Sequence, residues 1–403
     1  MRIAYIAQSY PPMISGAALF AREMAEGMAS RGHQVLVLAA SDRSQPYTVL
    51  HENLKVLRLK SFHNPMRVGQ RVLYYPRTTI LSALQEFAPD IIHTHEPLVS
   101  WVGLEYSKQA NIPITLTMHM LPWFVTAYLP HIPGIRATAE AVSWMYVRFM
   151  ARKFTSLIAT TKTASEAVTK MTGVQAKTIQ CGINMQIFHP RLSSRLESAT
   201  RKKLSLPLNV PIILHVGRLD TEKRVDRIVQ AAALAMRESN AHLLIVGDGL
   251  EKTALIKLSQ SLGIADRVHF PGFLSVRDGL PEIYRIASMF VMASEIESQG
   301  IVLLEAAASG LPIVAVDATS ISEVVHDGIN GYLAQPGDIQ ALCTAITKLL
   351  RSPRKARQMG RESLFLAKNY DILHIQKLHE QFYRKLMKQK HTARATTKEN
   401  LYA

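Results

Sequence analysis

Two glutamates, eight residues apart, stand in the stretch ASEIESQGIVLLEAAASG, which runs from Ala293 to Gly310. Glu297 precedes a short Ser-Gln-Gly sequence, and Glu305 lies in the apolar run that follows. On a helix, eight residues span roughly 12 Å at 1.5 Å per residue. The carboxyl pairs of glycosidases lie closer, at about 5–9.5 Å. The two carboxylates therefore fit the two ends of an elongated ligand better than the two sides of one scissile bond.

The residues between the two glutamates favour a phosphate site. The segment MFVMAS is typical of a strand, and Gly300 can start a helix that continues to Gly310. Backbone amides at a helix N-terminus bind phosphate. We expect one carboxylate to accept the hydroxyl groups of a sugar and the other those of a ribose. In the alternative interpretation, Glu297 is an ordinary loop charge and Glu305 a capping or surface residue.

Two further loops carry groups suited to phosphate. Arg218 and Lys223 lie in HVGRLDTEKR, just after an apolar run, where two cations could neutralise a diphosphate. A solvated charged loop is the alternative. Ser15 and Gly16 stand at the start of a helical pattern, but the G-x-G-x-x-G fingerprint of dinucleotide sites is absent there. A tight turn is the alternative for that loop.

The hydrophobic pattern predicts the sheets that position these loops. The segments RIAYIA, ALFAREMAEGMASRG and HQVLVLAA indicate strand, helix and strand, and the same order restarts near Pro211. In such α/β sheets, ligands bind beyond the carboxyl ends of the strands. The sequence therefore predicts two Rossmann-like, doubly wound domains that face each other across a deep cleft.

The pattern also suggests where the domains begin and end. We expect a first domain at 1–190, a linker near 187–208 and a second domain at 205–370. A helix at 371–390 is expected to pack back on the first domain. The polar tail 391–403 is expected to be flexible.

Composition limits the partners. The 403 residues carry a formal net charge of +16, which implies an anionic partner such as a phosphate ligand, an anionic membrane or nucleic acid. No nucleic-acid module is evident, so nucleic acid is not expected. The two cysteines lie far apart and belong to no metal-type spacing, so we expect a reducing cytoplasmic setting. No apolar run reaches 18 residues, so any membrane contact is expected to be peripheral.

The motifs together resemble a known family. GRLDTEKRVDRIVQAA, VGDGLEKTALIKLS, HFPGFL and SEIESQGIVLLEAAASGLPIVAVD follow in order. They resemble the nucleotide-sugar glycosyltransferases of the GT-B fold, retaining family 4, with its E-x7-E motif. The resemblance covers almost the whole chain and is most specific in the second domain. It implies transfer of a hexose, usually from a uridine-linked donor, with retention of anomeric configuration and without a metal.

The resemblance also implies roles in the second domain. Arg218 and Lys223 would hold the donor diphosphate. Glu297 would contact the transferred sugar as a catalytic residue, and Glu305 would hold the ribose.

Five further positions acquire roles from the same resemblance. Backbone amides at Gly300 and Ile301 would bind sugar and phosphate, and Leu274 would lie near the base. From the first domain, Gly16 would lie near the diphosphate. His119 would lie beside the sugar as the second catalytic residue.

The first domain should determine the acceptor. Between Asn53 and Gln85 there are six Lys or Arg residues and no acid. Arg67 and Arg71 are four apart, so they would share one face of a helix. Basic residues with aromatic neighbours suit an anionic membrane surface. A plain solvated face is the alternative.

A second apolar segment favours a lipid. The stretch TMHMLPWFVTAYLP resembles the corresponding part of family members that glycosylate diacylglycerol-type lipids, which suggests an acceptor channel near Trp123 and Phe124. Val142, Met145 and Phe149 follow at helical spacing, a pattern more typical of core packing than of a membrane face.

The leading hypothesis is a peripheral glycosyltransferase at the inner face of the membrane, with a lipid such as diacylglycerol or a glycolipid as acceptor. An alternative keeps the donor chemistry but uses a soluble or polysaccharide acceptor. An alternative of another class is a non-catalytic basic protein that binds membranes or nucleic acid.

Overall fold

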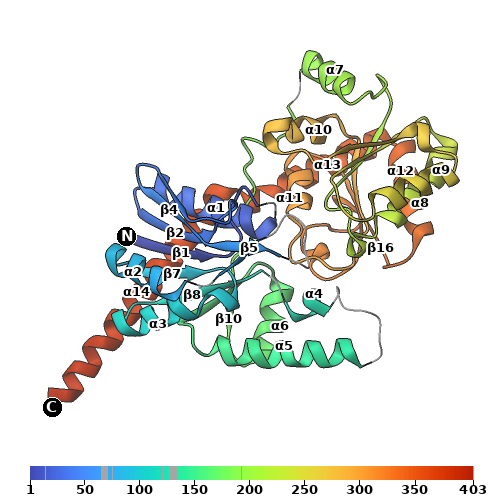
Figure 1. Ribbon diagram of the computed structural model, residues 1–403. Helices are drawn as coiled ribbons and strands as arrows, with labels where there is room; N and C mark the ends of the chain where they lie inside the picture. The colour runs from blue at the N-terminus through green and yellow to red at the C-terminus, as the bar shows by residue number, and fades with distance from the viewer. Residues whose placement is uncertain are drawn as a thin grey trace. The chain divides into compact units, whose positions relative to one another are not determined.

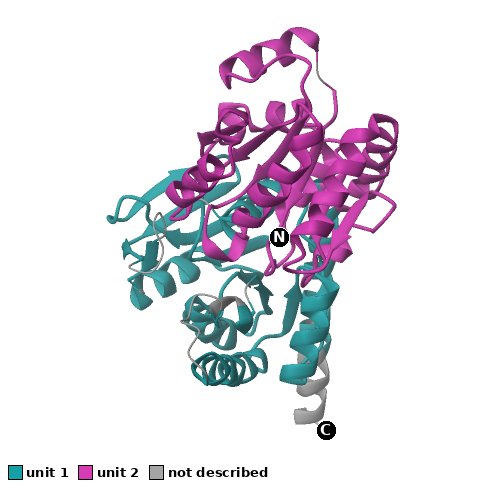
Figure 2. Ribbon diagram, turned by 90° about the vertical axis from the view of Figure 1, so that its right-hand side faces the viewer, with its two compact units in different colours: residues 1–182, 372–403 teal, residues 183–371 magenta. Residues whose placement is uncertain are grey.

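The computed structural model describes residues 1–13, 15–64, 71–74, 76–119, 121–126, 134–191 and 193–402, with only the backbone at 124, 125, 391 and 393–402. The chain divides into two compact units, which are coloured separately in Figure 2. Unit 1 comprises residues 1–182 and 372–403, and unit 2 comprises residues 183–371. Each unit holds a mainly parallel sheet, and this confirms the predicted α/β class with two Rossmann-like domains.

Unit 1 is built around one sheet with the strand order β10-β9-β8-β7-β1-β2-β4-β3. Its described neighbouring strands are parallel except for the pair β3–β4. A parallel strand covered on both faces needs apolar side chains on both, and the continuous apolar run of β1 meets this need. The strands are β1 (Arg2–Ala7), β2 (Gln34–Ala40), β3 (Tyr47–Leu50), β4 (Leu54–Leu59), β7 (Ile91–Thr94), β8 (Ile114–Met118), β9 (Ser156–Ala159) and β10 (Ala176–Thr178).

Helices and a small hairpin complete unit 1 (Figure 1). The hairpin pairs β5 (Ser61–His63) with β6 (Arg71–Leu73) in antiparallel register. The helices are α1 (Gly16–Ser30), α2 (Arg77–Phe87), the 3-10 turn η1 (Pro97–Val99), α3 (Trp101–Ala110), α4 (Pro122–Thr126), α5 (Ile135–Ala151), α6 (Lys162–Thr172) and α14 (Ile372–Tyr402).

Unit 2 has a six-stranded sheet in the order β13-β12-β11-β14-β15-β16, with parallel pairing between neighbours. Numbered within the unit, this order is 3-2-1-4-5-6, which is typical of doubly wound nucleotide-binding folds. The order reverses between β11 and β14, as it reverses between β1 and β7 in unit 1. The strands are β11 (Ile212–Val216), β12 (His242–Val246), β13 (Val268–Gly272), β14 (Met289–Met292), β15 (Ile313–Val316) and β16 (Gly331–Ala334).

The helices of unit 2 connect these strands. The α-helices are α7 (Ser194–Lys203), α8 (Val225–Ala235), α9 (Lys252–Ser261), α10 (Leu280–Ile286), α11 (Ile301–Ala308), α12 (Ile339–Arg351) and α13 (Pro353–Ala367). The 3-10 turns are η2 (Thr221–Lys223), η3 (Met236–Glu238), η4 (Ala265–Arg267), η5 (Val276–Asp278), η6 (Ile321–Glu323) and η7 (Lys368–Tyr370).

The chain passes between the units at Gly182, earlier than the boundary at 190 and the linker at 187–208 that the sequence predicts. A Cβ on Gly182 would lie 2.5 Å from Cδ1 of Ile372, where the chain returns to unit 1. On the unit 2 side, the Ile183 amide donates to the Tyr370 carbonyl at 2.7 Å. The chain leaves unit 1 after Gly182 and returns at Ile372, and the close packing of these two residues requires glycine at position 182. The predicted linker at 187–208 instead contains helix α7.

The last helix belongs to unit 1 and continues to Tyr402, beyond the end at 390 that the pattern predicts. Nε2 of Gln376 donates to the Glu23 carbonyl of α1 at 2.9 Å. The Tyr383 hydroxyl lies 2.6 Å from Nδ1 of His93 and 3.2 Å from the Tyr5 hydroxyl. These buried contacts join α14 to β1 and β7.

We expect Tyr383→Phe to lower the free energy of unfolding by about 1–3 kcal/mol, because the buried His93 would lose a hydrogen-bond partner. Tyr74→Phe is the matched control at a tyrosine that is 67% exposed. It should change stability by less than about 0.5 kcal/mol. Urea denaturation of both variants measures the difference, and equal losses would contradict the importance of the α14 contact.

Candidate functional site

The donor-side residues predicted from the sequence meet where the strand order of unit 2 reverses. Strands β11 and β14 are parallel neighbours. Arg218 and Lys223 follow β11, and Glu297 follows β14. Because parallel strands end at the same edge of a sheet, the two loops lie together at the edge where such folds bind ligands.

Lys223 and Glu297 form an ion pair across these two loops. Nζ of Lys223 donates to Oε1 of Glu297 at 2.6 Å. The two side chains are only 17% and 12% exposed, so water screens the pair weakly. Glu297 is therefore a largely buried, paired loop charge, and its contact with a sugar stays a prediction.

Arg218 is held by two carboxylates of its own loop. Its guanidinium pairs with Asp220, and Nη2 donates to Oε1 of Glu222 at 2.6 Å. The Arg218 side chain remains 40% exposed. The cation is thus oriented by its neighbours, and part of its surface stays accessible to an anion.

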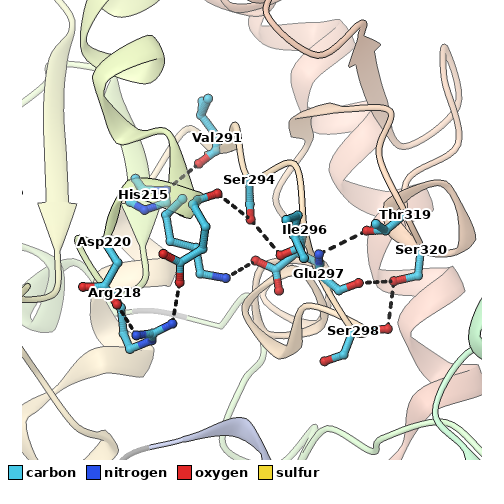
Figure 3. A network of polar contacts seen from close by, with 12 residues as sticks. His215, Arg218, Asp220, Val291, Ser294, Ile296, Glu297, Ser298, Thr319 and Ser320 are labelled. Carbon is cyan, nitrogen blue, oxygen red and sulfur yellow. Dashed lines mark hydrogen bonds and ion pairs between the residues drawn. The ribbon is translucent and has the colours of Figure 1, made fainter. Parts of the chain in front are cut away.

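The backbone at Glu297 is anchored to the loop after β15, as Figure 3 shows. The Glu297 amide donates to Oγ1 of Thr319 at 3.1 Å. Oγ of Ser320 donates to the carbonyls of Glu297 and Ser298, at 3.2 and 2.9 Å. These contacts fix the position from which the Glu297 side chain extends.

Gly300 and Ile301 form the start of α11, four residues after Glu297. Gly300 has a φ of 72°, a left-handed conformation that favours glycine. A Cβ there would also lie 3.0 Å from Cδ1 of Leu303. The turn places the N-terminus of α11 at the same sheet edge as the Lys223–Glu297 pair.

Glu305 lies inside α11 and is only 7% exposed, so it is neither a surface residue nor a cap. Its Oε2 accepts a hydrogen bond of 2.7 Å from the buried Tyr284 hydroxyl. Burial raises the pKa of Glu305 to about 7. The carboxyl group therefore changes charge near neutral pH.

Leu274 follows β13, at the edge of the unit 2 sheet, and packs against the apolar core of the unit. The neighbouring Phe273 is 47% exposed. Leu274 is thus partly a core residue, while Phe273 offers the exposed aromatic surface of this loop. That Leu274 lies near the base stays a prediction.

In unit 1, Gly16 begins α1 at the carboxyl end of β1. Oγ of Ser15 accepts a hydrogen bond from the Ala18 amide at 3.1 Å, which caps the helix. Ser15, which precedes Gly16, therefore has a structural role as the N-cap of α1. The helix N-terminus lies at the reversal point of the unit 1 sheet, the place analogous to the Lys223 loop in unit 2.

His119 follows β8 and contacts His95, which follows β7. Nε2 of His119 and Nδ1 of His95 share a hydrogen bond of 3.0 Å, and the Phe20 ring lies 4.9 Å from that of His119. Burial lowers the pKa of His119 to about 4. The ring is therefore neutral at pH 7 and can act through hydrogen bonds but not through a positive charge.

The sequence HTHEP contains polar residues whose part in this edge the sequence analysis missed. Glu96 accepts a hydrogen bond of 3.0 Å from the Gln8 amide, and burial raises the pKa of its carboxyl group to about 7. The rings of His93 and His95 stack at 4.6 Å. The sequence did contain a signal for these residues, because three titratable side chains, His93, His95 and Glu96, occur within four positions at a strand end.

The structure describes two of the four predicted acceptor or membrane residues. Trp123 lies in α4, and its ring is 5.7 Å from the Trp144 ring of α5. Arg67 and the side chain of Phe124 lie outside the described residues. Arg71 is in strand β6, not in a helix, and is only 6% exposed.

Arg71 is therefore corrected from a membrane residue to a structural one. Its Nε donates to Oγ of Ser61 at 2.8 Å, and its Nη1 lies 3.1 Å from Nε2 of His63. Elsewhere in the same basic stretch, Arg58 is also buried and donates to the Ala40 carbonyl. Two of the six basic residues of this stretch thus serve the fold and do not form an open surface.

No described helix combines the length and apolar character needed to cross a bilayer. Within the same part of the chain, no three His, Cys, Asp or Glu side chains are grouped as a metal site would require.

Comparison with protein families places this fold and site in a class. The family described as "Glycosyltransferase Family 4" matches residues 14–187, and "Glycosyl transferases group 1" matches residues 197–363. The matches fall on the first sheet and on the sheet that carries Lys223 and Glu297. The chain belongs to the family 4 glycosyltransferases of the GT-B fold, enzymes that use nucleotide sugars.

Individual relatives extend over most of the chain. A GDP-mannose-dependent alpha-mannosyltransferase of Mycobacterium tuberculosis is 29% identical over 90% of this chain and 92% of its own. An alpha-monoglucosyldiacylglycerol synthase of Streptococcus pneumoniae is 25% identical over 83% of this chain and 75% of its own. The solved sucrose-phosphate synthase of Thermosynechococcus elongatus superposes with a TM-score of 0.81 at 25% identity, covering 96% of this chain and 100% of that one.

The raised pKa of Glu305 predicts a pH-dependent stability. Because the folded pKa is above the usual 4.5, this carboxyl group favours folding at low pH, and the advantage is lost as pH rises towards and beyond about 7. The free energy of unfolding of Glu305→Gln, taken relative to that of the parent chain, should therefore be about 2–3 kcal/mol higher at pH 8 than at pH 5. Chemical denaturation at both pH values measures this change. Glu238→Gln, at an exposed carboxylate of the same unit, is the control, and an equally flat profile for both would contradict the prediction.

Proposed function

We propose that this chain transfers a hexose from a nucleotide-diphosphate sugar to a membrane lipid, with retention of anomeric configuration. The observation that carries the donor part is the ion pair between Lys223 and Glu297 at the reversal point of the unit 2 sheet. The pair brings a cation for phosphate and a carboxylate for sugar hydroxyl groups to one place.

The proposed donor complex rearranges this pair. The diphosphate takes hydrogen bonds from Lys223 and from the exposed part of Arg218, and it thereby competes with Glu297 for Lys223. Glu297 is then available to the sugar. As the bond from the anomeric carbon to the diphosphate oxygen breaks, the electron pair stays on the diphosphate, where the two cations stabilise it. The acceptor hydroxyl forms the new bond to the anomeric carbon, and its proton passes to the departing diphosphate oxygen. Because these cations supply the positive charge, we propose that no metal is required.

The remaining donor contacts follow the same edge. The N-terminus of α11 at Gly300 and Ile301 faces the sugar and phosphate, Glu305 holds the ribose, and Leu274 lies near the base. From unit 1, Gly16 lies near the diphosphate. His119 assists the transferred sugar as a neutral hydrogen-bonding group, held in place by His95.

The acceptor part of the proposal is supported by unit 1 and by a relative. Helix α4, with Trp123, follows His119 closely in sequence and packs on α5. Its apolar composition suits a lipid chain more than a sugar. The similarity to a monoglucosyldiacylglycerol synthase points in the same direction. We place the reaction at the cytoplasmic face of a membrane, with the enzyme as a peripheral protein.

A soluble acceptor is the second candidate, and the likeness to a sucrose-phosphate synthase favours it. Release of nucleoside diphosphate from a panel of sugar nucleotides, with and without a lipid extract, separates the two. Lipid-dependent release with a new glycolipid supports the proposal. Release that responds only to soluble sugars would overturn the lipid acceptor and retain the transferase.

We expect Glu297→Gln to lower kcat on the order of 100-fold with the fold intact, because the amide cannot stabilise developing positive charge on the sugar. Glu295→Gln is the matched control. Glu295 lies two residues away and pairs with Arg227, so the control should stay within a few-fold of the parent enzyme. Nucleoside diphosphate release measures both variants, and near-normal turnover of Glu297→Gln would defeat its assignment.

A further inference from the structure

Helix α5 is apolar on two opposite faces. One face, with Trp144 and Val147, is buried in unit 1. On the other face, Val142, Met145 and Phe149 are 53%, 67% and 53% exposed. The core packing predicted for Val142, Met145 and Phe149 is therefore wrong, because the buried face of α5 is the opposite one.

The exposed face extends onto the start of α3. Leu98 is 69% exposed and Trp101 is 39% exposed. The Trp101 ring lies 6.0 Å from that of Phe149, and its Nε1 donates to the Tyr146 hydroxyl at 3.3 Å. Figure 1 shows α5 along the lower rim of unit 1. We name this surface the α3–α5 face, defined by Leu98, Trp101, Val142, Met145 and Phe149.

Cations border the C-terminal end of this face. Arg148, Arg152 and Lys153 are exposed, and no acid occurs between positions 141 and 154. Nζ of Lys153 lies 4.3 Å from the centroid of the Phe149 ring. The three cations and this ring line an open hollow of about 450 Å³. Three cations beside an aromatic ring supply the charge that attracts a phosphate headgroup.

We propose that the α3–α5 face docks on an anionic lipid bilayer. Exposed apolar side chains beside clustered cations are typical of helices that lie in the membrane interface. Trp101 and Tyr146 combine apolar rings with polar edges, as side chains at the headgroup level do. The charge of the cluster is complementary to acidic lipids and agrees with the net charge of +16.

The opposite face of α5 connects this surface to the acceptor segment. Trp144, on the buried side, packs against Trp123 of α4 at 5.7 Å. One helix thus contacts the bilayer on one side and the proposed acceptor segment on the other. Docking would bring a lipid acceptor to α4 without its passage through bulk water. This link to the acceptor depends on the proposed function, whereas docking itself does not.

The test is co-sedimentation of the full chain with vesicles of phosphatidylcholine alone or mixed with phosphatidylglycerol. Met145→Ser/Phe149→Ser should weaken binding to the mixed vesicles at least about tenfold, because two apolar side chains no longer leave water. Arg148→Gln/Arg152→Gln/Lys153→Gln should weaken it more at low salt than at high salt. Phe365→Ser is the matched control, at a phenylalanine of unit 2 that is 63% exposed and lies beside Lys368.

Each outcome is informative. Loss of binding in both α5 variants, with an unchanged control and unchanged thermal unfolding, supports the docking surface. Unchanged binding would overturn it, as would a change of oligomeric mass in the α5 variants without vesicles, which would indicate a protein occupant. Glycosyl transfer to a detergent-dispersed acceptor is measured in parallel. The α5 variants should keep this activity, and its absence in the parent enzyme would count against the proposed function but not against docking.

Discussion

The burial of parallel strands on both faces is the constraint from which the sites of this protein follow. Strands such as β1 and β11 offer no position for a charged side chain along their buried lengths. Most of the proposed donor-site residues therefore lie in the loops at strand ends. The strand order reverses once in each sheet, and the loops diverge at that point. Lys223 and Glu297 lie there in unit 2, and Gly16 lies there in unit 1.

Sequence patterns locate such loops well, because a buried strand is a continuous apolar run and the loop follows it directly. Glu297 was predictable for this reason. The burial of Arg71 was not, because a spacing of four suits a helix face and gives no sign that Arg71 lies in a strand paired with β5. The contact between His95 and His119 could not be predicted either, because these residues follow two different strands and the order of strands in the sheet must be known first. The sequence also did not reveal the exposed side of α5, because Met145 and Met150 are the same residue type and only the fold determines which of them is buried.

Burial changes what several of the polar groups can do. Glu305 and Glu96 are carboxyl groups whose pKa is raised to about 7, and the pKa of His119 is lowered to about 4. A neutral imidazole held by a neighbouring ring acts as an oriented dipole. Such a dipole needs no reorganisation when charge develops nearby, which is the property that makes electrostatic stabilisation effective in a site that excludes water.

The positive charge of the chain is distributed in a way that separates its two proposed tasks. At the donor edge, Lys223 and Arg218 are already paired with carboxylates. In the proposed donor complex, an anion at Lys223 competes with Glu297, and a sugar that engages the released Glu297 offsets the loss of this ion pair. At α5 no acid stands among Arg148, Arg152 and Lys153. Unopposed cations attract any anionic surface at long range. Selectivity thus belongs to the paired cations, and non-specific attraction to the unpaired ones.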